Sequence, residues 1–203
     1  MQNHSSKLLD NAVEQFASLP GIGRKTALKF VLHLLKKSPE EVTAFIQSLD
    51  DLKKNIKECR KCHNMADSEL CEICTDPQRD PHTICVVENL KDILSIEATG
   101  QYHGLYHVLG GIISPIDGIG PSDLHIDSLL QRIENEDIQE IIFALSATIE
   151  GDTTGYFIYK RLKNHENLTI STIAKGISVG NDLEYTDELT LGRSILNRIA
   201  FGE

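Results

Sequence analysis

The chain has 203 residues, and its 40% hydrophobic and 25% charged residues exclude wholesale disorder and suit one medium domain or a few small ones. Its apolar stretches fall short of the ~18–20 residues that span a bilayer, so we expect no membrane partner. The net charge is −10, yet residues 1–62 hold 11 Lys and Arg against 7 Asp and Glu. This asymmetry favours a basic module attached to an acidic body, with an ordinary solvated helix face as the alternative.

Three helices are predicted before the first cysteine, from apolar residues at helical spacing. The first covers Leu8–Phe16, the second runs from Arg24 to about Lys37, and the third follows Ser38. Ser38 is the expected N-cap of the third helix, with Pro39 at its first position and Glu41 completing a capping box.

Two glycines separate the first two helices and permit a sharp hairpin that a partner can approach closely. The hairpin leaves the first N–H groups of the second helix without helical partners, which predicts an anion site. Lys25, Lys29 and Lys36 lie within ~40° of one another on a helix and extend this site as a basic stripe, whereas Arg24 points ~100° away from Lys25. Phosphate is the natural ligand, and an ordinary helix–helix turn is the alternative. The candidate contacts are Gly21, Gly23, Arg24, Lys25, Lys29 and Lys36.

Four of the five cysteines follow the pattern C-x2-C-x8-C-x2-C, at Cys59, Cys62, Cys71 and Cys74. Each C-x2-C pair forms a tight turn with two sulfurs, and two such turns complete a tetrahedral thiolate site with no position left for water. The pattern therefore predicts a structural Zn²⁺ ion, with disulfides or an iron–sulfur cluster as alternatives. The fifth, Cys85, is expected to pack as a small apolar residue in a strand.

Strand-like and helical segments alternate after the cysteines, which predicts an α/β fold with a mainly parallel sheet. The expected strands are Thr83–Glu88, Gly104–Leu109, Glu140–Ser146 and Leu168–Ala174. The expected helices are Lys91–Ala98, about Asp123–Glu134, Thr153–Lys163 and a last one from about Asp187, with Leu189, Leu191, Ile195, Leu196 and Ile199 as apolar positions.

Four carboxylates follow three of these strands: Glu88, Asp117, Glu150 and Asp152. Ligands of parallel sheets bind beyond the carboxyl ends of the strands, so the four residues would meet at one rim if the strands are neighbours. There they are expected to form either a weak Mg²⁺ site or a surface for a partner. The simpler alternative is solvated side chains or helix caps, with Asp152 as the N-cap of the helix at Thr153.

The motifs together carry a resemblance to a known family. The segment L-P-G-I-G-R-K at residues 19–25 looks like the helix-hairpin-helix motif of non-sequence-specific DNA-binding proteins. With the four-cysteine module behind it, this half resembles the RecR family of bacterial recombination mediator proteins. The α/β region resembles the Toprim domain, and the segments 71–74, 96–102, 114–121 and 180–185 also fit RecR closely. The resemblance spans nearly the whole chain.

Two departures concern the acidic rim. Catalytic Toprim members carry a Glu after the first strand and a later Asp-x-Asp pair; Glu88 matches the first, but residues 150–152 read E-G-D. RecR proteins usually have N-P-T-x-E-G where residues 146–151 read S-A-T-I-E-G. This difference puts in doubt any role of the usual Asn.

We expect an α/β protein with four parts: a helix-hairpin-helix module at residues 1–57, a four-cysteine zinc module at 58–76, a Toprim-like domain at 80–175 and a helical assembly tail at 176–203. The resemblance implies a non-enzymatic mediator that binds single-stranded, double-stranded or gapped DNA. It also implies RecO, and RecF as a further candidate, as partners in loading RecA, and self-association into dimers or tetramers. Because the first residues lead into an amphipathic pattern and not an apolar signal core, we expect a cytoplasmic, nucleoid-associated location. A Mg²⁺-dependent Toprim nuclease or primase-type enzyme and a zinc-ribbon adaptor without DNA contact are the alternatives.

Overall fold

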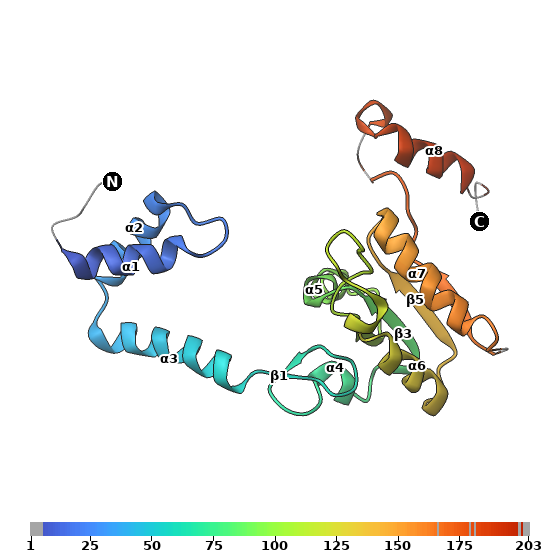
Figure 1. Ribbon diagram of the computed structural model, residues 1–203, viewed down its shortest axis with the longest axis horizontal. Coiled ribbons are helices and arrows are strands. Elements are labelled where there is room, and N and C mark those ends of the chain that lie inside the picture. The colour runs from blue at the N-terminus through green and yellow to red at the C-terminus, as the bar shows by residue number, and fades with distance from the viewer. Residues whose placement is uncertain (1–5, 166, 179, 181, 199, 201–203) are drawn as a thin grey trace. The chain divides into compact units, whose positions relative to one another are not determined.

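The computed structural model describes residues 6–165, 167–178, 180, 182–198 and 200 (Figure 1). The chain divides into two compact units, Met1–Ile56 and Lys57–Glu203. Among the described residues, every helix is too short or too polar to cross a membrane.

The first unit contains three helices: α1 (Lys7–Ala17), α2 (Arg24–Leu34) and α3 (Pro39–Asn55). Ser6 caps α1, and the predicted capping box between Ser38 and Glu41 is present at the start of α3. The small core lies between α1 and α2 and is built on Val13, Ala27 and Val31. Helix α3 buries none of its residues.

Helix α2 ends earlier than the sequence predicts, at Leu34 instead of Lys37. The N–H groups of Lys36 and Lys37 donate to carbonyls three residues back, at 3.1 and 3.0 Å, so the chain turns here. The turn follows from the next helix: its proline restricts Ser38, which is extended at φ −67° and ψ 154°. Lys36 therefore lies beyond the helix that was expected to carry it.

The second unit begins with the cysteine module. Strands β1 (Lys57–Glu58) and β2 (Met65–Ala66) pair antiparallel, and the short helix α4 (Glu72–Thr75) follows. The module is joined to the rest of the unit by the Val108 N–H, which donates to the Cys62 carbonyl at 2.8 Å. Ile73 packs against the cysteines and also against the core of the sheet.

A four-stranded parallel sheet forms the centre of the second unit, with the strand order β4-β3-β5-β6. The strands are β3 (Asp80–Val87), β4 (Gly104–Val108), β5 (Glu140–Ala144) and β6 (Thr169–Thr172). The helices are α5 (Leu90–Glu97), α6 (Ile126–Asn135), α7 (Ile149–Leu162) and α8 (Glu188–Leu196), with 3-10 turns at Pro121–Asp123 and Leu183–Tyr185. The predicted parallel α/β architecture is confirmed.

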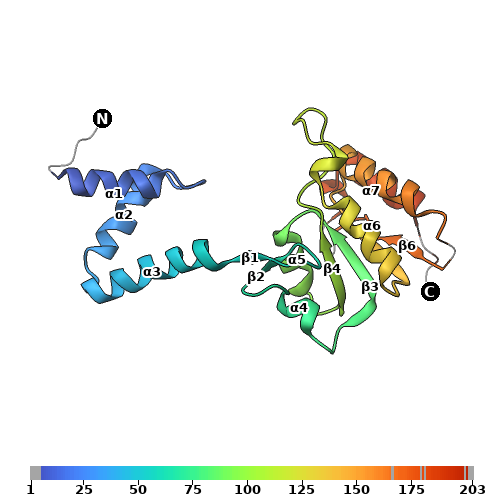
Figure 2. The ribbon, with the colours of Figure 1, turned by 60° about the horizontal axis from the view of Figure 1, so that its bottom comes forward.

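Alternate residues of β3 face opposite sides of the sheet and build two apolar layers. Ile84 and Val86 pack with residues of α6 and α7 on one face. Cys85 and Val87 pack with Ile93 of α5 on the other. Helix α5 therefore covers the face of the sheet opposite α6 and α7 (Figure 2). Cys85 is thus buried in a strand, as the sequence predicts, and burial raises the pKa of its thiol to about 12.

Helix α7 begins four residues before its predicted start, so Asp152 is not its N-cap. Thr148 takes that role and accepts a hydrogen bond from the Gly151 N–H at 3.1 Å. Glycine is required at position 151, because a Cβ there would lie 2.2 Å from the Ser146 carbonyl oxygen. Helix α6 differs in the other direction: Pro121–Asp123 forms a separate 3-10 turn and α6 starts only at Ile126.

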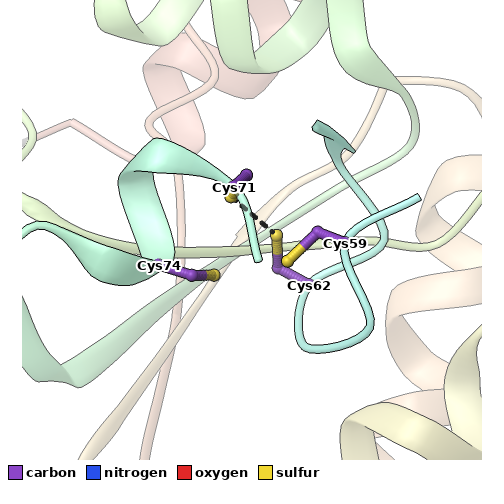
Figure 3. A group of neighbouring side chains, drawn as sticks. All are labelled: Cys59, Cys62, Cys71 and Cys74. Carbon is purple, nitrogen blue, oxygen red and sulfur yellow. Dashed lines mark hydrogen bonds between the residues drawn. The ribbon is translucent and has the colours of Figure 1, made fainter. Parts of the chain in front are cut away.

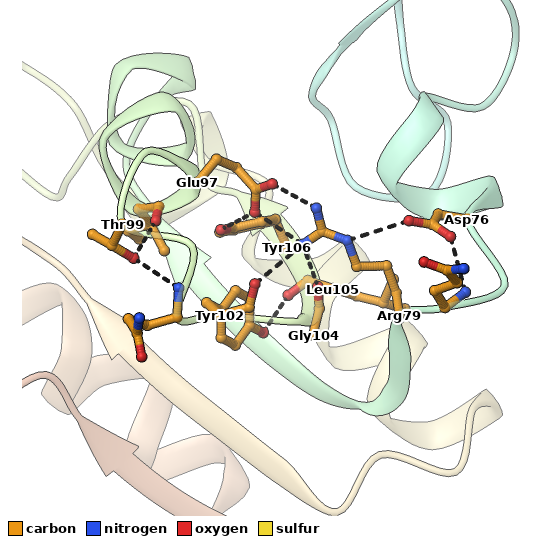
Figure 4. Close-up of polar contacts among 11 residues, drawn as sticks. Asp76, Arg79, Glu97, Thr99, Tyr102, Gly104, Leu105 and Tyr106 are labelled. Atoms are coloured by element: carbon orange, nitrogen blue, oxygen red, sulfur yellow. Dashed lines mark hydrogen bonds and ion pairs between the residues drawn. The ribbon is translucent and has the colours of Figure 1, made fainter.

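An ion-pair network closes the edge of the sheet at β4 (Figure 4). The Arg79 guanidinium donates to both carboxylate oxygens of Glu97, at 2.9 and 2.5 Å, and the Tyr106 hydroxyl donates to the same carboxylate at 2.6 Å. The bond from Arg79 holds the pKa of Glu97 below its usual value. This network fixes α5 against the strand and the segment that leaves α4.

The C-terminal helix α8 is present and begins at Glu188, close to its predicted start at about Asp187, which is its N-cap. Its apolar residues Leu189, Ile195 and Leu196 are exposed. Ile199, which was expected to continue the apolar set, lies outside the described residues.

Candidate nucleic-acid interface and metal centre

The glycine hairpin between α1 and α2 combines one strained and one open position. Gly21 has φ +77°, a left-handed conformation that favours glycine, whereas Gly23 has φ −77° and serves as the N-cap of α2. A Cβ at either glycine would meet no atom within 4 Å. The side chain of Ile22 between them packs toward the core of the unit. The backbone at these two glycines is therefore open to a ligand.

The hairpin leaves hydrogen-bond donors free. The Thr26 and Ala27 N–H groups both donate to the Gly23 carbonyl, at 2.9 and 3.0 Å. Within the described part of the chain, the N–H groups of the three residues from Gly23 to Lys25 have no partner. Together with the positive end of the helix dipole, these donors suit an anion.

Lys25 and Lys29 extend this donor group along α2. Both side chains are exposed, and neither forms an ion pair with any residue that the structure describes. Arg24 behaves differently, because its guanidinium lies 3.6 Å from Asp10 and 3.8 Å from Glu14 of α1. Lys36 is exposed but follows the end of the helix. The structure thus places two of the three stripe lysines on one helix beside the free N–H groups.

The four cysteines predicted to bind metal come together (Figure 3). Their sulfur atoms lie within 4.8 Å of one another, and the Cys62 and Cys71 sulfurs are 3.5 Å apart. All are free thiols, and three of the four side chains are buried. Tetrahedral Zn²⁺ with Zn–S bonds of ~2.3 Å requires sulfurs about 3.8 Å apart, so the residues fit the ion.

Local backbone bonds shape the first cysteine turn. The Cys59 N–H donates to the Asn64 carbonyl at 2.7 Å, and the His63 N–H donates to the Cys59 carbonyl at 2.8 Å. Crowding also perturbs the thiols: the hydrogen bond to Cys71 raises the pKa of Cys62 and lowers the pKa of Cys71. Four thiolates at this spacing repel one another, and a divalent cation removes the repulsion.

The four rim carboxylates do not come together as one metal group among the described residues. Glu88 accepts a hydrogen bond of 2.6 Å from the Ser146 N–H, and Asp117 accepts one of 2.6 Å from the Ser114 hydroxyl. Asp152 pairs with Lys175, and an Arg193 nitrogen lies 3.6 Å from it. Glu150 lies in the first turn of α7. Three of the four side chains therefore have protein partners.

The structure also brings together a group that the sequence did not predict: Glu58, His63 and His125. Two of its members lie one residue from a cysteine of the metal module, which was a usable signal for His63 and Glu58. His125 carried none, because only the fold places the start of α6 beside the cysteine turn.

Four known domain families match the chain in order. They are the helix-hairpin-helix of RecR over residues 9–53, the four-cysteine zinc finger domain of RecR over 56–76, the Toprim domain over 82–174 and the C-terminal region of RecR over 176–199. Recombination protein RecR of Porphyromonas gingivalis is 55% identical over 203 residues, which cover 100% of this chain and 98% of that protein. The chain belongs to the RecR family.

Other RecR proteins are similarly close. Those of Bacteroides thetaiotaomicron and Flavobacterium johnsoniae are each 56% identical, over 200 and 198 residues, and the matches cover at least 95% of each protein. The four-cysteine zinc finger of RecR coincides with the four gathered sulfurs, so the chain carries a structural Zn²⁺ site, and the disulfide and iron–sulfur alternatives are dropped. The helix-hairpin-helix of RecR includes the open glycine turn and its two free lysines.

Proposed function

We propose that this protein is a DNA-binding recombination mediator, which binds the sugar-phosphate backbone of DNA through the hairpin between α1 and α2. The observation that carries this proposal is the conjunction of free N–H groups at Gly23–Lys25 with the unpaired, exposed side chains of Lys25 and Lys29. Such contacts hold a phosphate backbone and carry no sequence information. The relatives, each named as a recombination protein, support a role in recombinational repair.

The salt dependence of DNA binding tests the hairpin. Each lost phosphate contact lowers the slope of log K against log salt by about 0.9 on duplex and about 0.7 on single-stranded DNA. The double variant Lys25→Ala/Lys29→Ala should therefore have a slope shallower by about 1.4–1.8. The variant Lys160→Ala/Lys163→Ala changes the net charge equally at the far end of α7 and serves as the control. Equal slopes for the wild type and the hairpin variant would contradict the proposal.

The acidic second part of the chain suits a partner protein. Residues 63–203 hold 9 Lys and Arg against 23 Asp and Glu. We propose that this acidic body, including the rim of Glu88, Asp117, Glu150 and Asp152, binds basic surfaces of RecO, and of RecF as a further candidate, to help RecA load onto single-stranded DNA. Co-sedimentation with purified RecO, with and without Glu150→Lys, tests this step. Undiminished binding by the variant would remove the rim from the interface.

Self-association is the third element of the proposal, and the exposed apolar faces of α3 and α8 support it. Phe45, Ile46, Leu49 and Leu52 are all 41–60% exposed on α3. We propose that a second copy of the chain covers this face. Such an assembly would combine several weak hairpin contacts and so raise the effective affinity for DNA. Solution mass with and without gapped DNA tests it, and Leu49→Lys should lower the mass. A wild type that stays monomeric in both conditions refutes it.

A non-enzymatic role fits the occupied rim carboxylates. Asp152 faces the cationic groups of Lys175 and Arg193, which a metal ion would have to displace, and one oxygen of Glu88 already accepts the Ser146 N–H. Nuclease and primer-synthesis assays with Mg²⁺ or Mn²⁺ test this. DNA cleavage or nucleotide incorporation that Glu88→Gln abolishes would establish the enzymatic alternative instead.

A further inference from the structure

Glu58, His63 and His125 form a second group of metal-ligating side chains in the unit of residues 57–203. Each offers one ligand atom, and the three atoms lie within 4.8 Å of one another. We propose that this group is a second metal site, separate from the four-cysteine centre, for a divalent transition-metal ion of the Zn²⁺ type. Imidazole and carboxylate ligands in this combination suit Zn²⁺, Ni²⁺ and Cu²⁺ and leave a position open to water.

The carboxylate of Glu58 faces both rings. Its Oε1 atom contacts His63 Nδ1 and lies 3.7 Å from His125 Nε2. Glu58 and His63 come from the cysteine module, whereas His125 immediately precedes α6. An ion held by the three side chains therefore joins the module to the α/β domain by a bond that is independent of the thiolates.

The outer nitrogens of both rings are already occupied. His125 Nδ1 lies 3.1 Å from the Val108 carbonyl oxygen, which only accepts, so Nδ1 carries a hydrogen. The Ser128 hydroxyl donates to the His125 carbonyl at 3.0 Å and so accepts from His63 Nε2, at 2.8 Å. Outer hydrogen bonds of this kind accompany histidines that bind metals, because they determine which ring nitrogen carries the hydrogen.

These bonds leave His63 Nδ1 and His125 Nε2 facing the same carboxylate oxygen. The two nitrogens and this oxygen are ligand atoms of the kind that a divalent transition-metal ion coordinates, two neutral and one anionic. The cluster thus has a donor set that suits such an ion.

The backbone under the ligands is firmly held. His63 is the one residue other than glycine in the described chain with a left-handed backbone, at φ 62°, and its N–H donates to the Cys59 carbonyl. The rings of His63 and His125 stack with centroids 3.7 Å apart and planes 17° from parallel. Coordination requires the rings to turn toward a common point, and the χ2 torsion of histidine is soft enough to permit that rotation.

Metal stoichiometry of the full-length protein tests the site, with Co²⁺ as the probe and Zn²⁺ as a second ion. The wild type should take up two equivalents, one for each group, and only the ion at the four cysteines should show thiolate-to-cobalt charge transfer. The variants His125→Ala and His63→Gly should each lose the equivalent without charge transfer and keep the other. His165→Ala, which removes an exposed histidine elsewhere, is the matched control and should keep both.

His63→Gly is expected to fold, because glycine adopts the left-handed backbone of this position without strain and the substitution removes only the side chain. Circular dichroism and retained charge transfer verify its fold. A wild type that binds a single equivalent shows that the group is a metal-free contact between Glu58 and the histidines, and overturns the proposal. Two equivalents retained in both His125→Ala and His63→Gly overturn it as well.

Discussion

Replacing Gly23 by alanine should weaken DNA binding and leave the free energy of unfolding almost unchanged. The position has φ −77° and ψ 157°, which any residue adopts, and open space around the added Cβ. Alanine caps a helix less well than glycine, by an amount of about 0.5 kcal/mol, but it also restricts the unfolded chain by about 0.4–1 kcal/mol. The two effects oppose each other, so the free energy of unfolding should change by less than about 0.5 kcal/mol.

The effect on DNA should be larger. The new methyl group projects beside the free N–H groups of Gly23, Arg24 and Lys25, which a phosphate must approach to hydrogen-bond distance. A hydrogen bond to a charged group contributes about 1.5–3 kcal/mol, so weakening one of them should raise the Kd for DNA about tenfold or more.

Gly21→Ala is the contrasting variant. Its φ of +77° should make alanine destabilising by about 1–2 kcal/mol, and any loss of DNA binding would then follow unfolding of the hairpin. Denaturant titration by circular dichroism and fluorescence anisotropy with labelled DNA at one fixed salt concentration measure the two effects. A Gly23→Ala protein that binds DNA as tightly as the wild type would refute the backbone-contact argument.

Three further predictions concern the second unit. Cys59→Ser should lose the structural zinc and lower the melting temperature, as measured by metal analysis and thermal melting; stoichiometric zinc with an unchanged melt would contradict it. Gly151→Ala should lower the free energy of unfolding by about 1–3 kcal/mol, because the Ser146 carbonyl lies close to the added Cβ. Gly155→Ala on the same helix has neighbours at 3.6 Å and beyond, so it should raise the free energy of unfolding by up to about 1 kcal/mol. Denaturant titrations that show a change of the same sign for both variants would refute this. The lowered pKa of Glu97 means that its bonds stabilise the fold fully above the unfolded pKa of about 4.3 and are lost as the pH falls through the folded pKa. In Glu97→Gln the free energy of unfolding should therefore fall less steeply than in the wild type as the pH is lowered. Asp50→Asn, at an exposed ion pair, should leave this pH dependence unchanged.

The sequence alone was sufficient for features that depend on neighbouring residues. The C-x2-C spacing identified all four zinc ligands, because the turn that presents two sulfurs is local. The capping box at Ser38 and Glu41 and the alternation of strands and helices also follow from short-range rules, and the structure confirms both. The glycine spacing likewise located a hairpin with free N–H groups and two free lysines.

The predictions of helix ends were wrong where the local sequence allowed more than one start or end of the helix. Asp152 and Thr148 are both acceptable caps, and the close packing of Gly151 on Ser146 selected Thr148. Helical spacing alone placed Lys36 on α2, but the turn before Pro39 ended the helix first.

Only the tertiary structure decided which distant side chains meet. It gave Asp152 the partners Lys175 and Arg193, where the sequence suggested a shared acidic rim. It also brought His125 to Glu58 and His63, although no motif links them. The physical reason is that spacing along the chain fixes the geometry of one turn or one helix face, whereas contacts between segments depend on how the apolar faces of the sheet and its helices pack.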